Sequence, residues 1–251
     1  MGRVIPSIKI AAIHADLPWR EWNPLQEQVF VVIPAYREGP VLRETIESLL
    51  PYPYKVVVVD DGSDDNCLEN LARLPIHYLR HPLNLGQGAA LQTGTVYSLE
   101  KGADFIVHFD ADGQHPADQI PALLEPIRAG EADVVLGSRF LKRSDLEMVP
   151  VKKRIALRIG IIVSGLLTGV WLTDTHNGFR ALSAEAARKI DLRENRFAHA
   201  TEFLDHLRLQ HLRYKEIPST IRYTTYSIKK GQPISNGLDI ILDLLLRKVM
   251  K

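Results

Sequence analysis

Short, strongly apolar runs alternate along the first half of the chain with longer segments whose apolar residues recur at helical spacing. The runs predict buried strands at residues 29–34, 55–59, 76–80, 105–109 and 133–137. The intervening segments predict helices at residues 41–50, 68–74, 88–101 and 121–129. Because strands and helices alternate in this way, we expect an α/β fold with a mostly parallel sheet and helices on both of its faces.

The pattern is less regular after residue 140, where we predict a loop, a long helix, a turn with a short strand, a helix, an edge strand and a final amphipathic helix. In that order, these elements occupy residues 144–150, 152–170, 173–182, 201–210, 214–223 and 238–251. Pro218 favours the edge position, because proline cannot donate to a central ladder. We therefore expect an N-terminal extension at 1–28, one domain at 29–232 and a C-terminal helix at 233–251.

Polar and acidic residues follow three of the predicted strands. These segments are Pro34–Glu38, Asp60–Ser63 and Asp110–Asp112. In open α/β sheets, ligands bind outside the carboxyl ends of the strands. The three segments are therefore expected to meet in one ligand site.

Two carboxylates one residue apart, Asp110 and Asp112, end the fourth predicted strand. Their oxygens are hard ligands suited to Mg²⁺ or Mn²⁺. The segment is also ordinary turn chemistry, with aspartate as a cap and Gly113 at positive φ, and by itself it does not decide between the two. A calcium loop is disfavoured, because Leu124 and its neighbours occupy the region where a glutamate ligand is required.

Composition narrows the class of protein. The 251 residues include 31 basic and 30 acidic side chains, so no global field favours nucleic acid and we expect no such partner. The single cysteine, Cys67, excludes an intramolecular disulfide and fits a reducing, cytoplasmic compartment. Residues 1–28 lack the apolar core of a signal peptide, and the longest apolar run, 159–172, is shorter than the roughly 20 residues of a bilayer span.

Five segments, in order and at suitable spacing, resemble the family 2 glycosyltransferases. They are Val31–Tyr36, Val58–Ser63, Asp110–Pro116, Gly137–Arg139 and Asn177–Arg180. The resemblance extends over about residues 29–232 and is greatest to the branch that transfers mannose or glucose to dolichyl or polyprenyl phosphate. It implies a GT-A fold with a Rossmann-like sheet, a GDP- or UDP-sugar as donor, and Mg²⁺ or Mn²⁺ as cofactor.

The resemblance also assigns residues to the donor. The implied donor-binding residues are Pro34, Tyr36, Glu38, Asp61, Asp110, Ala111 and Arg139. The implied metal ligands are Asp110, Asp112 and Gln114. A divalent ion and the forked guanidinium of Arg139 would neutralise charge on the departing nucleoside diphosphate. By residue type alone, Arg139 is expected to form a surface salt bridge. Its position directly after the fifth predicted strand instead favours a role in the ligand site.

A basic excess marks the expected acceptor side. Residues 139–158 contain seven basic and two acidic side chains and lead into a predicted apolar helix. This combination is suited to binding a lipid phosphate or anionic lipid headgroups. Basic patches of this kind are also common on ordinary solvent-exposed surfaces. The resemblance implies that Lys153 or Arg154 binds the acceptor phosphate and that Tyr226 and Lys230 lie in a loop closing over donor and acceptor. Thr224 stands where relatives acting on dolichyl phosphate carry arginine, which leaves the exact acceptor open.

The need for a general base depends on the acceptor. A lipid phosphate is already an anion and needs only positioning, whereas a sugar hydroxyl must lose a proton. Glu202 or Asp205 is the candidate base and completes a catalytic set with Asp112 and Arg139, although acids are also common where helices begin. The final helix either packs on the domain or lies on a membrane.

Two further features carry weaker signals. Asn84–Gly88 contains a partial G-x-G pattern, with Leu91 where a third glycine would be needed, so we interpret it as a turn that starts a helix rather than a dinucleotide site. His176 is either a site residue near the acceptor or a turn cap.

The leading hypothesis is an inverting transferase that moves mannose or glucose from a nucleotide donor to a polyprenyl phosphate, with the protein peripheral on the inner face of the cell membrane. One alternative keeps the fold and transfers to a saccharide or glycolipid hydroxyl. A sugar nucleotidyltransferase would need a glycine-rich basic loop after the first strand, where the chain offers only Arg37 and Gly39. A non-enzymatic nucleotide-binding module would not need both Asp110 and Asp112.

Overall fold

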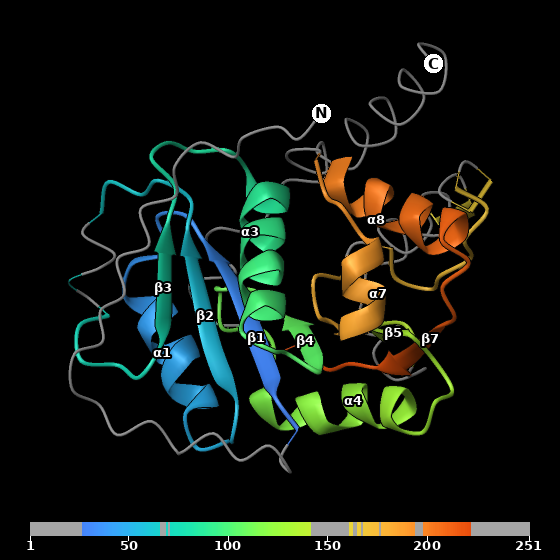
Figure 1. Cartoon of the computed structure of the whole chain (residues 1–251), viewed down its shortest axis with the longest axis horizontal. Helices are drawn as coiled ribbons and strands as arrows, with labels where there is room; N and C mark the ends of the chain where they lie inside the picture. The colour runs from blue at the N-terminus through green and yellow to red at the C-terminus, as the bar shows by residue number, and fades with distance from the viewer. Residues whose placement is uncertain are drawn as a thin grey trace.

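A computed structural model of the chain describes residues 27–65, 69, 71–141, 161–162, 165–166, 168–175, 177–193 and 198–221 (Figure 1). The predicted N-terminal extension up to residue 26, the loop at 144–150 and the C-terminal helix lie outside the described residues. The same holds for five candidate site residues, Lys153, Arg154, His176, Tyr226 and Lys230.

One sheet of seven strands organises the described residues, in the order β3-β2-β1-β4-β6-β5-β7. The strands are β1 Val29–Ala35, β2 Lys55–Asp60, β3 His77–Arg80, β4 Phe105–His108, β5 Val134–Ser138, β6 Arg180–Ser183 and β7 Tyr214–Pro218. Strand β6 runs antiparallel to β4 and β5, and all other neighbouring pairs are parallel. The predicted α/β fold with a mostly parallel sheet is confirmed.

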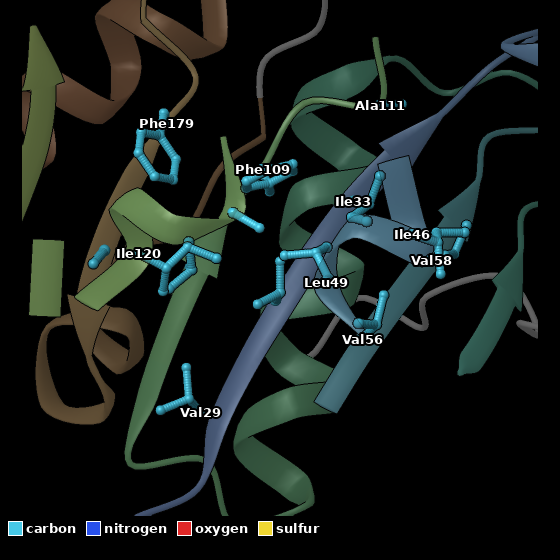
Figure 2. Close-up of a cluster of buried hydrophobic side chains, with 14 of the residues drawn as sticks. Val29, Ile33, Ile46, Leu49, Val56, Val58, Phe109, Ala111, Ile120 and Phe179 are labelled. Atoms are coloured by element: carbon cyan, nitrogen blue, oxygen red, sulfur yellow. The ribbon is translucent and has the colours of Figure 1, made fainter. Parts of the chain in front are cut away.

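Helices cover both faces of this sheet. They are α1 Gly39–Leu49, α3 Gln87–Glu100, α4 Ile120–Arg128, α7 Ala184–Lys189 and α8 Ala198–Leu209, with a short 3-10 helix, η1, at Ala117–Gln119. Alternate residues of β1 point to opposite layers, as strand geometry requires. Val31 and Ile33 join the cluster containing α1 and α4, shown in Figure 2, whereas Phe30 and Val32 join the cluster containing α3, α7 and α8.

A glycine allows α3 to approach the sheet closely. A Cβ added at Gly94 would lie 2.3 Å from Val32 Cγ1, so no larger side chain fits there without displacement. The contact fixes α3 against the central strand β1. It thereby sets the position of the residues at the start of α3, which the site uses.

Some predicted elements differ in extent or were missed. Residues 71–73 form a turn, so the helix predicted at 68–74 does not reach Leu74. Helix α7 was not predicted because it has only six residues; the Ser183 hydroxyl caps it by accepting from Ala186 N. The antiparallel direction of β6 was also not foreseen. Across the described ranges, no helix combines the length and apolarity needed to cross a bilayer.

Candidate active site

The carboxyl ends of β1, β2, β4, β5 and β7 meet at one edge of the sheet, called here the site edge. Because β6 runs in the opposite direction, it begins at this edge rather than ending there. Neighbouring segments are joined by backbone bonds, for example Asp61 N to Ala35 O and Gly137 N to Phe179 O, both at 2.8 Å. Strand order reverses between β1 and β4, and such a switch point is where open α/β sheets bind ligands.

The Asp110 carboxylate is held from several sides. Gln87 Nε2 donates to its Oδ1 and His115 Nε2 to its Oδ2, both at 3.2 Å. A Cβ added at Gly178 would lie 2.5 Å from both carboxylate oxygens, so only glycine lets that backbone lie against Asp110. Burial opposes its ionisation, but the His115 hydrogen bond and the charges of His115, Arg180 and His199 together lower the pKa of Asp110. Asp110 is therefore fixed and ionised.

The second carboxylate lies in an environment of opposite character. Burial, and then the negative charge of Asp110, raise the pKa of Asp112, and Glu38 acts in the same direction. The backbone N–H of Gln114 donates to Asp112 Oδ1 at 3.0 Å and partly offsets this effect. The carboxylates of Asp110 and Glu38 thus both oppose a negative charge on Asp112.

The acidic segment is also a turn, as the second interpretation of the sequence held. Gly113 has a φ of 71°, and Asp112 caps the Gln114 N–H. The buried Thr45 hydroxyl of α1 donates to Ala111 O at 3.0 Å and ties the turn to that helix. The turn is therefore confirmed, and cation binding by this segment stays a prediction. Within the described part of the chain, no group of three or more His, Cys, Asp or Glu side chains is arranged to hold a metal ion.

Asp61 has a structural task that the sequence did not reveal. It is buried, and its carboxylate accepts from His81 Nδ1 at 2.7 Å, Leu85 N at 2.9 Å and Gly86 N at 2.7 Å. These bonds hold the turn that starts α3, with Gly86 at a φ of 98° and Gln87 next in the chain. Residues 84–86 lead directly into α3, which begins at Gln87, and Asp61 supports this loop that brings Gln87 to Asp110.

The loop after β1 is tied to the loop after β2. Arg37, at a φ of 56°, pairs through Nε and Nη2 with both oxygens of Asp64 at 2.7 Å, and its backbone N donates to Ser63 Oγ at 3.0 Å. The Arg37 guanidinium also lies over the Tyr36 ring. Pro34 is buried in β1, while Tyr36 is exposed and Glu38 half-buried at the site edge. Contact of these three residues with a nucleotide stays a prediction.

Arg139 forms a salt bridge, but its partner is not a surface residue. Its Nε and Nη2 donate to the two oxygens of Asp174 at 2.6 and 2.7 Å, and its backbone N also donates to Asp174. The Asp174 side chain is 2% exposed and that of Arg139 is 32% exposed. The segment carrying Asp174 is bound in turn by Glu216 of β7, which accepts from Thr173 N. Asp174 therefore orients a half-exposed guanidinium after β5.

The candidate bases lie on α8. Glu202 and Asp205 are half-buried, and Glu202 accepts from Arg193 N at 2.9 Å. Between them, Phe203 and Leu204 are buried in the second core cluster. Arg180, which donates to His108 at the end of β4, also lies 3.8 Å from the centre of the Phe203 ring. The start of α8 therefore lies near the end of β4.

Sequence reasoning missed the side chains that hold the acids. His115 lies in the Asp110–Pro116 segment and had no predicted role, yet it is buried, stacks on Phe179 and contacts Asp110. His108 stood out as a polar residue inside an apolar strand, and Arg180 pairs with it across 72 residues of sequence. The polar character of His115 and His108 could be seen in the sequence, but the residues that they contact could not be predicted from it.

Comparison with known proteins places this site in a family. The family model described as glycosyl transferase family 2 matches residues 30–191. An uncharacterised protein of Methanocaldococcus jannaschii is 36% identical over 228 residues, 89% of this chain and 93% of its own. A UDP-N-acetylglucosamine–dolichyl-phosphate N-acetylglucosaminyltransferase of Methanococcus voltae is 30% identical, over 89% of this chain and 97% of its own. An undecaprenyl-phosphate mannosyltransferase of Micrococcus luteus is 34% identical, over 66% and 70%.

Among solved structures, S. aureus TarS has a TM-score of 0.52 at 15% identity, covering 87% of this chain and 70% of its own, and it has also been solved with UDP-GlcNAc. At that identity the likeness concerns the fold alone. The fold is the GT-A, nucleotide-diphospho-sugar transferase fold that the sequence predicted. The chain belongs to the family 2 glycosyltransferases.

Proposed function

We propose that this protein is an inverting glycosyltransferase that moves a hexose from a nucleotide-diphosphate sugar to a polyprenyl phosphate at the membrane surface. The observation that carries the proposal is the pair Asp110 and Asp112 at the switch point of the sheet, one fixed and ionised, the other unneutralised. The names of the relatives from M. voltae and M. luteus supply the acceptor class.

The acidic residues fit a divalent cation. Asp112 is the better ligand, because the carboxylates of Asp110 and Glu38 leave its surroundings short of positive charge. Asp110 and the side chain of Gln114 would complete the protein's share of ligands, with phosphate and water oxygens filling the rest, as is usual for Mg²⁺ or Mn²⁺. When bound, the ion supplies positive charge to the departing diphosphate.

The protein's own groups then have separate tasks in the transfer. An oxygen of the lipid phosphate attacks the anomeric carbon, the bond from that carbon to the nucleoside diphosphate breaks, and a phosphodiester forms with inversion. No proton has to be removed, so positioning suffices. Arg139, kept in orientation by Asp174, faces the charge that develops on the leaving group.

A hydroxyl acceptor is the second candidate. It requires a base, and Glu202 or Asp205 on α8 would take the proton. The observation that keeps this candidate is the packing of α8 beside β4, because Arg180 contacts both His108 of β4 and Phe203 of α8. Contact of Lys153, Arg154, Tyr226 and Lys230 with the acceptor, and a peripheral position on the inner membrane face, are further parts of the proposal.

The test is a donor and acceptor panel. The full chain is incubated with labelled UDP-GlcNAc, UDP-glucose or GDP-mannose, Mn²⁺ and polyprenyl phosphate, and the mixture is extracted with organic solvent. We expect label in the organic phase for one donor, as an acid-labile lipid-linked sugar. Label on an added saccharide or glycolipid would favour the hydroxyl acceptor. Label wholly in the aqueous phase, with every donor intact, would refute glycosyl transfer with these substrates.

A further inference from the structure

Arg180 places a guanidinium inside the protein, directly behind the site edge. It is the first residue of β6 and only 4% exposed. In the sheet it stands in register with His108 of β4 on one side and Leu136 of β5 on the other. Its Nε–H donates to His108 Nδ1 at 3.0 Å, and its guanidinium lies 3.8 Å from the centre of the Phe203 ring in α8.

The bond to His108 continues into α3. Because Arg180 donates, His108 Nδ1 accepts, and the neutral ring carries its proton on Nε2, which faces Thr95 Oγ1 at 3.0 Å. Burial, followed by the charges of Arg180 and His199, lowers the pKa of His108 well below its ordinary value, in agreement with a neutral ring. One arginine thus connects β6, β4, α3 and α8.

A buried arginine of this kind calls for an explanation. Replacing buried polar or charged groups by apolar ones of similar volume is often neutral or stabilising, so stability alone is a weak reason to keep it. Burial lowers the pKa of Arg180 to about 10, while Asp110 raises it, so the guanidinium remains charged at neutral pH. The negative charge that acts on it is that of the fixed site carboxylate.

We infer that Arg180 is a positioning residue for glycosyl transfer, a buried cation that keeps the Asp110 carboxylate and the first turns of α8 in a fixed relation. Arg180 donates to His108, two residues before Asp110, and it follows Gly178, whose backbone lies against the Asp110 carboxylate. Its contact with Phe203 packs the turn of α8 that carries Glu202. The inference rests on the proposed function, because it assigns a task at that same site. A purely structural arginine would have no effect on ligand affinity once the fold is restored.

Two variants separate positioning from folding. Arg180→Met leaves His108 Nδ1 without its donor and is expected to lower both the melting temperature and Mn²⁺-dependent binding of UDP or GDP. Arg180→Met combined with His108→Leu makes the pair apolar and should regain most of the melting temperature. We expect the double variant to bind the nucleotide with Mn²⁺ about tenfold or more weakly than the natural chain, the range for partners behind a metal ligand.

Calorimetric titration of the full chain with UDP and GDP, with and without Mn²⁺, provides the readout. Arg213→Met is the control, because Arg213 pairs with Asp133 just before β5 and β7 begin, at the opposite edge of the sheet from the site. It should leave the Mn²⁺-dependent affinity unchanged. A double variant that equals the natural chain in both melting temperature and affinity overturns the inference.

If the double variant does not fold, Arg180→Lys decides. Lysine keeps the positive charge, so the Mn²⁺-dependent affinity for the nucleotide should stay within about threefold of that of the natural chain. This change is well below the loss that is typical when a group supporting a metal ligand is removed. A folded lysine variant that loses as much affinity as Arg180→Met overturns the role of the charge. These measurements do not depend on transfer: a natural chain that binds nucleotide but transfers no sugar to lipid refutes the proposed function, while the variants still decide the role of Arg180.

Discussion

At the scale of single residues, the site depends on neutral and basic neighbours as much as on the acids. Asp110 has contacts with Gln87 and His115, and the backbone of Gly178 lies against it. The acids were predictable because they follow an apolar strand. Their neighbours were not, because each comes from a distant part of the chain and has no pattern of its own.

Gly178→Ala tests this close approach. The added Cβ would lie 2.5 Å from both Asp110 oxygens, so we expect the carboxylate to move and kcat/KM to fall about tenfold to 100-fold, as for other groups that support a metal ligand. The measurement is a double-mutant cycle with Asp110→Ala, which removes those oxygens. If Gly178→Ala lowers kcat/KM by the same factor in the Asp110→Ala variant as in the natural chain, the effect of the added methyl group does not depend on Asp110.

Arg139→Lys tests the forked guanidinium. Lysine keeps the charge but cannot make two parallel bonds, so we expect kcat to fall about tenfold or more with little change in melting temperature. Arg213→Lys is the control, because Arg213 makes a similar bidentate pair with Asp133. Equal activity of both variants would remove Arg139 from the reaction and leave it a purely structural partner of Asp174.

At the scale of elements, the sequence predicted most accurately the strands that are buried on both faces. Strands β1 and β2 are apolar on both faces, and such runs are unambiguous between helical segments. The direction of β6 could not be predicted, since the pattern of a four-residue strand does not indicate whether it pairs parallel or antiparallel with its neighbours. That direction matters for function, because it brings Gly178 and Arg180 to the end of β4.

Gly94→Val tests the packing of α3 on β1. The new side chain would meet Val32 at 2.3 Å from its first carbon, and overpacking of this kind costs about 1–3 kcal/mol. We expect a clearly lower melting temperature by calorimetry. Glu100→Ala, at the end of the same helix, should change stability by less than about 0.5 kcal/mol. Equal melting temperatures for the two variants would contradict the close approach.

At the scale of the whole molecule, the sheet has two halves that meet at the site. Strands β1 to β4 come from residues 29–108 and are all parallel, whereas β5, β6 and β7 come from residues 134–218. Figure 1 shows the same division, with β2 and β3 on one side of α3 and α7, α8, β5 and β7 on the other. The halves join where β4 pairs with β6, and Asp110 lies two residues beyond the end of β4.

The first half was almost wholly predictable, because strands and helices alternate there with clear polar signals at the strand ends. The second half was less so, since its strands are short and pair out of sequence order. Asp174 illustrates the reason: its local sequence indicates no partner, and its pairing with Arg139 arises only when β5 and the segment before β6 come together. Long-range pairing, not local pattern, decides this half of the site.

The central claim is that Asp112 holds a donor through a divalent cation for transfer to a lipid phosphate. The most direct measurement compares Asp112→Asn with Asp118→Asn, an exposed aspartate of η1, in Mn²⁺-dependent transfer of sugar to polyprenyl phosphate. We predict that Asp112→Asn lowers transfer by about 100-fold, the upper end of losses at the partners of metal ligands, while Asp118→Asn retains it. Equal, Mn²⁺-dependent transfer by both variants would contradict the account.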